Sequence, residues 1–187
     1  MIYISKGVEV KNLFRKGVIV LYCGGRYAMN DKMALLWRRG KGRFAHVYSL
    51  EEKELLEELK NKGLVECSVH TSKYGRFYLL TNCLIGVSNN RNAFFELNRM
   101  DRTILLWMSR SAFRLNISEL IYLTEMKIYP TKFLLGEHNR IELMRRIHNG
   151  AMNSGKYLEQ KALIACCRDE VVESVARLIR KGKLYLI

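Results

Sequence analysis

The sequence predicts a helix-rich α+β protein built from two related units. The stretches 31–37 and 101–107 share one order: an aspartate, a basic residue, and an apolar run that ends in tryptophan. A second pattern, Leu-x-x-Lys-Gly followed by apolar residues, occurs at 59–63 and again at 178–182. Such repetition is typical of duplicated small modules. Short β-branched runs beside the helical patterns add strands to the prediction.

A β-hairpin followed by a helix is predicted near the N-terminus. Residues 16–23 are mostly β-branched and apolar, Gly24-Gly25 favours a turn, and residues 26–29 can return as the partner strand. The pair Asn30-Asp31 offers two candidate caps for a helix over 32–39, because a short side-chain oxygen accepts hydrogen bonds from the first amides of a helix.

The next segment predicts a second helix and a second hairpin. Residues 49–52, Ser-Leu-Glu-Glu, match a capping box and start a helix over 50–61. An apolar strand over 64–70, a polar and basic tip over 71–76, and a strand over 77–81 follow. This order predicts strand, turn and strand.

The second half predicts mainly helices. Residues 82–92 are rich in glycine, serine and asparagine and form the best linker candidate. Pro130 is expected to end any helix before it. The other predicted elements are a strand at 93–97, helices at 101–109, from 116, at 139–148, at 157–167 and after 168, and a strand at the C-terminus.

A helix that ends in Lys-Gly-Leu-Val and enters a hairpin with a basic tip resembles the last helix and wing of the winged-helix family. The segment from Glu54 to Thr81 supports this resemblance. It implies two winged-helix-like units, each with a small antiparallel hairpin, over 1–85 and 88–187. It also implies a helix-turn-helix mode of DNA binding, in which the helix after Arg168 is the recognition helix.

Composition excludes several classes of protein. The chain has 187 residues, 49% hydrophobic and 27% charged, which is typical of a globular protein and not of a disordered one. No apolar run is long enough to cross a bilayer, and the N-terminus lacks the pattern of a signal peptide. We therefore expect a cytoplasmic protein without a membrane partner. The net charge of +14 favours a polyanionic partner, of which nucleic acid is the commonest.

No pattern in the chain predicts catalysis. The phosphate-binding, zinc-protease and nucleophile-elbow motifs are absent, and the five cysteines and four histidines do not have zinc-ligand spacing. We expect no enzyme activity, no cofactor and no metal. Trp37 and Trp107 are expected in cores, and Cys166-Cys167 is expected inside a helix.

Clustered basic residues define the candidate nucleic-acid site. Those near the first helix and at the tip of the expected wing would contact phosphates, and those of the last helix would read bases. The helix over 50–61 contains five glutamates and is a poor reader of DNA. The leading hypothesis is a sequence-specific or structural DNA-binding protein, a transcriptional regulator or mobile-element accessory protein, with double-stranded DNA as its partner. The candidate residues are Arg38, Arg39, Lys41, Arg43, Lys73, Arg76, Arg168, Arg177, Arg180 and Lys181.

Peptide binding is the alternative hypothesis. Strands, the run from Tyr27 to Trp37, and a helix ending in Leu-x-x-Lys-Gly-Leu also resemble the leader-recognition domain of ribosomal peptide modification systems. That resemblance implies an acidic peptide or protein that binds as an added strand. The segment between the Trp37 helix and the Ser49 helix differs from the pattern of that family, because its members have another helix at this place. A structural role and a homodimer stay open.

Overall fold

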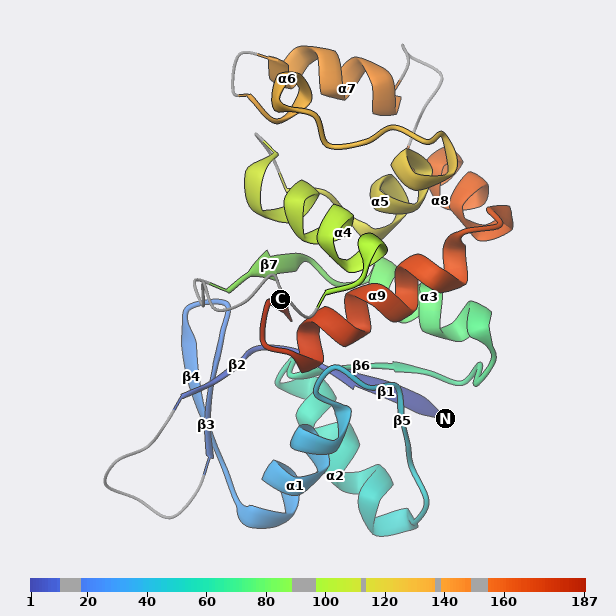
Figure 1. Cartoon of the computed structure of the whole chain (residues 1–187). Helices are drawn as coiled ribbons and strands as arrows, with labels where there is room; N and C mark the ends of the chain where they lie inside the picture. The colour runs from blue at the N-terminus through green and yellow to red at the C-terminus, as the bar shows by residue number, and fades with distance from the viewer. Residues whose placement is uncertain (11–17, 89–96, 112–113, 137–138, 149–154) are drawn as a thin grey trace. The chain divides into compact units, whose positions relative to one another are not determined.

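The computed structural model describes residues 1–10, 18–88, 97–111, 114–136, 139–148 and 155–187 (Figure 1). The chain divides into two compact units: unit 1 is Met1–Cys83 with Tyr185–Ile187, and unit 2 is Leu84–Leu184. Because 55% of the described residues are helical and the sheets are small and antiparallel, the predicted helix-rich α+β class is confirmed. None of the described helices has the length and apolar character that a bilayer requires.

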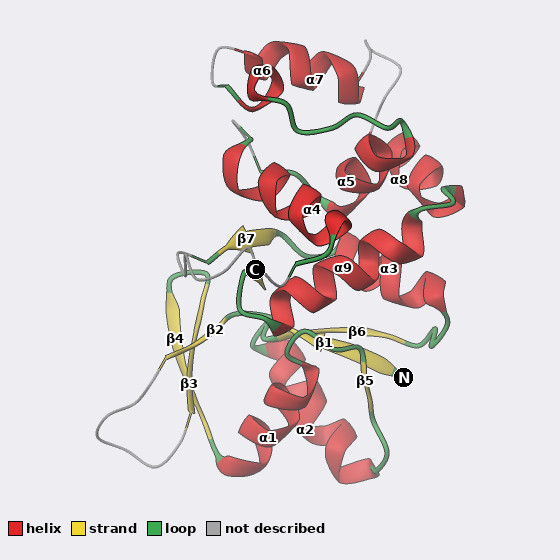
Figure 2. Cartoon of the chain, viewed as in Figure 1, coloured by secondary structure: helices red, strands yellow, loops and turns green. Residues whose placement is uncertain are grey.

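Unit 1 combines two small sheets with three helices (Figure 2). One antiparallel sheet has the order β5-β1-β6, and the other has the order β2-β3-β4. The elements of this unit are β1 (Ile2–Ser5), β2 (Val8–Val10), β3 (Val18–Tyr22), β4 (Gly25–Met29), α1 (Asp31–Gly40), β5 (Ala45–His46), α2 (Leu50–Asn61), β6 (Val65–Ser68) and α3 (Lys73–Thr81).

The first predicted hairpin and helix are confirmed. β3 and β4 pair through Val20 and Tyr27, and the turn between them has φ of 47° at Cys23 and 79° at Gly24. Two successive positive φ values match the twist that a two-residue hairpin needs. Asn30 is the cap of α1: its Oδ1 accepts from the Met33 amide at 2.9 Å.

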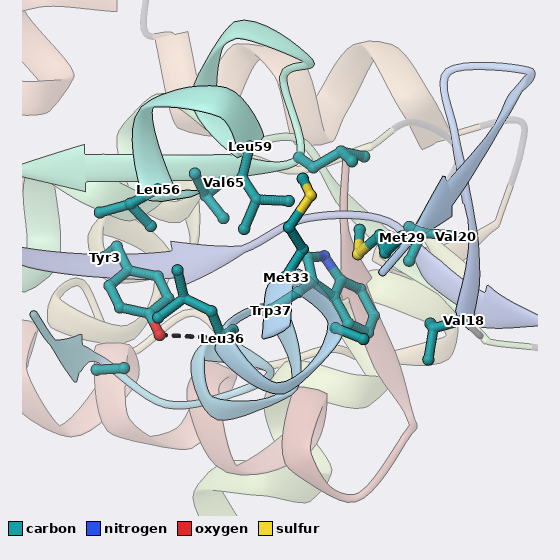
Figure 3. Packing of buried hydrophobic residues seen from close by; sticks show 13 residues of the cluster. Tyr3, Val18, Val20, Met29, Met33, Leu36, Trp37, Leu56, Leu59 and Val65 are labelled. Atoms are coloured by element: carbon teal, nitrogen blue, oxygen red, sulfur yellow. Dashed lines mark hydrogen bonds between the residues drawn. The ribbon is translucent and has the colours of Figure 1, made fainter. Parts of the chain in front are cut away.

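Side chains of β1 hold the end of α1 in the core of unit 1. Tyr3 Oη donates to the Leu36 carbonyl at 2.8 Å (Figure 3). Ser5 Oγ donates to the Trp37 carbonyl at 2.7 Å. The Trp37 indole N–H donates in return to the Lys6 carbonyl at 2.9 Å. The bond from Ser5 satisfies one of the last four carbonyls of α1, which have no donor within the helix. Trp37 is fully buried, so its predicted core position is confirmed.

The predicted second hairpin is only half correct. β6 forms, but residues 73–81 form helix α3 instead of the returning strand (Figure 2). β6 pairs instead with β1, and Tyr3 lies opposite Cys67. The strand that partners β6 therefore comes from the start of the chain and not from the next segment. The wing that motivated the winged-helix resemblance of unit 1 is therefore absent from residues 64–81, and the winged-helix units are not confirmed.

Unit 2 consists mostly of helices. α4 packs on α9, and α5 packs on both α8 and α9. β7 lies within the predicted linker. Residues 93–96 of the strand expected at 93–97 lie outside the described residues. The elements are β7 (Ile85–Val87), α4 (Arg99–Arg110), α5 (Ile117–Glu125), α6 (Lys132–Leu135), α7 (Arg140–His148), α8 (Gly155–Ile164) and α9 (Arg168–Arg180). The last strand, β8 (Leu184–Leu186), crosses the boundary, because only Leu184 belongs to unit 2.

The repeated Leu-x-x-Lys-Gly pattern produces the same helix end twice. After α2 the Leu64 amide donates to the Leu59 carbonyl at 2.9 Å, and after α9 the Lys183 amide donates to the Leu178 carbonyl at 2.9 Å. The glycine of the pattern has φ of 71° in the first copy and 65° in the second. Both are the left-handed helix ends that glycine favours, and each leads into a strand, as predicted.

Helix boundaries in unit 2 depart from the prediction in two places. α4 starts earlier than expected, because Asn98 and not Asp101 is its cap; Asn98 Oδ1 accepts from the Asp101 amide at 2.7 Å. α8 ends at Ile164, so Cys166 and Cys167 lie in the turn before α9 and not inside a helix. Cys166 is exposed there.

Candidate nucleic-acid interface

The basic run after the Trp37 helix lies in the last turn of α1 and the loop that follows. Arg38 forms an ion pair with Glu9 of β2 at 2.6 Å, and Arg39 forms one with Glu52 of α2 at 2.8 Å. Arg43 is exposed. The first two arginines therefore join elements within unit 1, and Arg43 is an exposed cation of the run.

Arg39 is held by four separate groups. Besides Glu52, its guanidinium donates to the Tyr3 hydroxyl at 3.2 Å and to the His46 carbonyl at 3.1 Å, and it lies 5.5 Å from the centre of the Tyr48 ring. Its hydrogen bond to the Glu52 carboxylate is the main reason that the pKa of Glu52 lies below its ordinary value. Arg39 therefore has a fixed position at the surface.

The pKa of Glu9 is likewise lowered by the arginine with which it pairs, Arg38. The hydrogen bond from Arg38 lowers the pKa of the Glu9 carboxyl, against the opposing effect of burial. Lys41 has a different environment, because its ammonium lies 5.5 Å from the centre of the Trp37 ring. Such contacts hold a cation at an aromatic surface without neutralising its charge.

Lys73 and Arg76 lie in the first turn of α3 and not at a wing tip. Neither has an acidic neighbour within that turn, and Ser72 makes no side-chain cap bond. Because helix N-termini are already positive, two cations there increase the attraction for an anion. Arg76 also lies 5.5 Å from the centre of the Phe44 ring.

The contact between Arg76 and Phe44 joins two predicted groups of cations. Phe44 directly follows Arg43, so the end of the α1 basic run and the first turn of α3 meet at one aromatic ring. We name this region the Phe44 surface, and it consists of Arg43, Phe44, Lys73 and Arg76.

The predicted contacts of the last helix divide into interior and exposed residues. Arg168 is buried and donates to the Leu163 carbonyl at 2.6 Å. Arg177 binds Asp101, which is 1% exposed, through Nε and Nη2 at 2.9–3.1 Å. Both guanidinium groups therefore bind other parts of unit 2. Arg180 and Lys181 are exposed at the end of α9.

Three aromatic residues of this region escaped the sequence analysis. Phe44, His46 and Tyr48 alternate with Ala45, which is buried, and Val47, which packs against the core. The alternation of aromatic and aliphatic residues over five positions is the signal of a half-buried strand. It predicts β5 and its outward rings from the sequence.

The described residues suggest no metal site or reactive thiol pair. They contain no group of three or more His, Cys, Asp or Glu side chains that could hold an ion. Each of the five cysteines is a free thiol. What the region around Phe44 offers a ligand is positive charge and aromatic surface.

Comparisons with known proteins do not identify a relative. No protein-family model, no curated protein and no solved structure matches the chain.

Proposed function

We propose that this chain binds nucleic acid through the Phe44 surface of unit 1. The observation that supports this most is the position of the Arg76 guanidinium over the ring of Phe44, the residue that follows Arg43 in the chain. A polyanion needs several cations within reach of neighbouring phosphates, and sequences far apart in the chain supply them here. The net charge of +14 favours the same partner over long distances.

The proposal assigns different roles to the ten predicted residues. Arg43, Lys73 and Arg76 contact phosphates, and Lys41 lies next to them along the chain. Arg38 and Arg39 fix the loop through Glu9 and Glu52. Arg168 and Arg177 have no part in base reading, because Arg168 is buried and Arg177 binds Asp101. Arg180 and Lys181 belong to unit 2 and are not part of the Phe44 surface.

Salt dependence tests the proposal. Binding of a short mixed-sequence oligonucleotide is measured by fluorescence anisotropy at increasing salt, with single-stranded and duplex forms in parallel. Affinity is expected to fall steeply with salt, and Arg43→Ala is expected to reduce the slope of log K against log salt by about 0.7–0.9, the value for one lost phosphate contact.

Arg145→Ala is the matched control. Arg145 is 70% exposed on α7 of unit 2 and forms an ion pair with Glu142, so its removal changes the net charge equally. The control is expected to bind like the unmodified protein. Affinity that does not change with salt, or equal losses in the two variants, contradicts the proposal.

A second candidate function, peptide binding, is favoured by the sheet β2-β3-β4. Within the described residues β2 and β4 each pair with β3 alone. The outward face includes three apolar side chains that are 38–39% exposed, Val8, Val10 and Leu21. An extended peptide that adds to such an edge gains main-chain hydrogen bonds and apolar contacts.

Arg26 distinguishes the two functions. It is exposed on β4, opposite Leu21. If an acidic peptide adds to β4, Arg26→Glu weakens peptide binding and leaves oligonucleotide binding nearly intact. Each variant is titrated with both ligands. Arg43→Ala is expected to weaken oligonucleotide binding and to leave peptide binding nearly intact, which is the reverse of Arg26→Glu, so the two functions are separated.

A further inference from the structure

Three rings form a row on the outward side of the edge strand β5. Phe44, His46 and Tyr48 are two residues apart, and side chains at that spacing lie on one face of an extended chain. The ring centres of His46 and Tyr48 are 6.4 Å apart, with an angle of 35° between the ring planes. We name these three residues the aromatic row.

Two members of the aromatic row, His46 and Tyr48, are exposed and Phe44 is half-buried, whereas Ala45 is buried and Val47 is half-buried. Tyr48 is 78% exposed and His46 is exposed, but Ala45 is 8% exposed. The strand pairs with β1 on one side, His46 opposite Ile2, and in the described part of the chain it is the end of its sheet. The backbone of the row is therefore fixed by the sheet while its rings face outward.

Guanidinium groups lie at both ends of the aromatic row. Arg76 lies over Phe44 and Arg39 lies over Tyr48, each 5.5 Å from the ring centre. Arg39 is held by Glu52, by Tyr3 and by the His46 carbonyl, so it is already positioned before any ligand arrives. The negative charge of the Glu52 carboxylate is neutralised by its ion pair with Arg39.

We propose that the aromatic row stacks the unpaired bases of single-stranded nucleic acid, so that the ligand of the Phe44 surface is a single strand and not a duplex. This inference rests on the proposed function. Aromatic side chains stack on bases of any sequence, and a cationic border tracks the phosphates. Stacked bases are about 3.4 Å apart, so rings separated by about twice that distance match successive bases of an extended strand. In a duplex, the faces of each base are covered by the neighbouring base pairs, so the rings of the aromatic row find no free base face to stack on.

Substitution of single rings tests the row. Tyr48→Ala and His46→Ala are compared with the unmodified protein for binding to a labelled single strand, a single-stranded RNA of the same sequence, and the duplex. Each variant is expected to weaken single-strand binding about tenfold, the typical loss when one stacking residue is removed. Tyr48→Phe is expected to restore the affinity, because it retains the ring.

Tyr157→Ala is the matched control. Tyr157 is 40% exposed on α8 of unit 2 and has the ammonium of Lys161 5.5 Å from its ring centre. It reproduces an accessible tyrosine beside a cation outside the aromatic row. Its removal is expected to leave single-strand binding unchanged, and circular dichroism of every variant verifies the fold.

The salt slope separates stacking from charge. Tyr48→Ala is expected to lower affinity equally at every salt concentration, whereas Arg43→Ala reduces the slope. Duplex bound as tightly as single strand, or unchanged binding in both Tyr48→Ala and His46→Ala, overturns this inference and leaves the proposed function standing. Absence of binding to either form overturns the proposed function itself.

Discussion

The two tryptophans occupy equal places in the repeated sequence but have different hydrogen bonds. Trp37 donates to the Lys6 carbonyl at 2.9 Å, whereas the buried indole nitrogen of Trp107 has no acceptor among the described residues. Both are almost fully buried. Sequence similarity therefore predicted the burial of both indoles correctly. It gave no information about the acceptor of Trp37, which lies between β1 and β2.

This difference predicts unequal costs for the same substitution. Trp37→Phe leaves the Lys6 carbonyl without its donor and is expected to cost about 1–3 kcal/mol more than Trp107→Phe, which removes a donor that has no acceptor. Urea unfolding followed by circular dichroism measures both. Equal losses of stability would show that packing volume alone determines the cost.

The cysteines divide into accessible and protected thiols. Burial raises the pKa of Cys67 to about 11 and the pKa values of Cys83 and Cys167 to about 12. Cys23 and Cys166 are exposed. Because the thiolate is the reactive form, a raised pKa keeps a buried thiol unreactive at neutral pH.

We therefore expect iodoacetamide near neutral pH to modify Cys23 and Cys166 first. Cys67, Cys83 and Cys167 should react only as the protein unfolds or as the pH approaches their raised pKa values. Mass spectrometry of tryptic peptides after timed labelling identifies the order. Early labelling of Cys83 in folded protein would contradict its burial.

At the scale of elements, α3 is the clearest failure of the sequence prediction. Residues 77–81 begin Phe-Tyr-Leu-Leu, which favours a strand by composition, yet they form a helix that buries Phe77, Leu79 and Leu80. The partner that β6 needed was already supplied by β1. Local propensity gave no information about this pairing, because β1 and β6 are separated by most of unit 1. Cap signals, in contrast, are local, and those at Asn30, Ser49 and Asn116 were predictable.

Gly75 shows how closely α3 packs against the segment before it. A Cβ at this position would overlap the carbonyl oxygen of His70. Gly75→Ala is therefore expected to lower stability by about 1–3 kcal/mol, although alanine is the better helix former. Thermal unfolding measures the loss.

Gly155→Ala is the control for this prediction. Gly155 starts α8, and among the described residues no atom beyond its chain neighbours and its own helix backbone lies within 4 Å of the Cβ that alanine would add. Its unfolding temperature should stay the same or rise slightly. If both glycine substitutions had the same effect, the contact with His70 would not be the cause.

At the scale of the whole molecule, the net charge of +14 is the basis of the proposed partner class but was a poor guide to the individual contacts. Arg38, Arg39 and Arg177 bind carboxylates that are 29, 13 and 76 residues away along the chain. A sequence does not indicate such distant partners, so these residues look available when they are not. The cations near Phe44 became a candidate site only when the fold brought α3 to that ring.

The ion pairs of unit 1 predict how stability depends on pH. Because Arg39 lowers the folded-state pKa of Glu52, this carboxylate stabilises the fold above its unfolded pKa near 4.5, and the contribution is lost as pH falls through the lower folded value. Glu52→Gln should therefore be less stable than the unmodified protein at pH 7, and the gap should close in acid. Urea midpoints measured across this range give the result.

Glu54→Gln serves as the comparison for charge. It removes the same charge from the same helix, on an exposed residue. Its stability should follow that of the unmodified protein at every pH. A gap for Glu52→Gln that persists in strong acid would show that the residue acts through packing and not through its ion pair.

The distribution of the two tryptophans has a practical consequence. Each unit contains one indole, Trp37 in unit 1 and Trp107 in unit 2, and each is shielded from water. Intrinsic fluorescence therefore contains one reporter per unit, and emission shifts to longer wavelength when the corresponding core opens. Replacement of one tryptophan leaves the other as the only indole fluorophore, so the unfolding of each unit can be followed separately in the full chain.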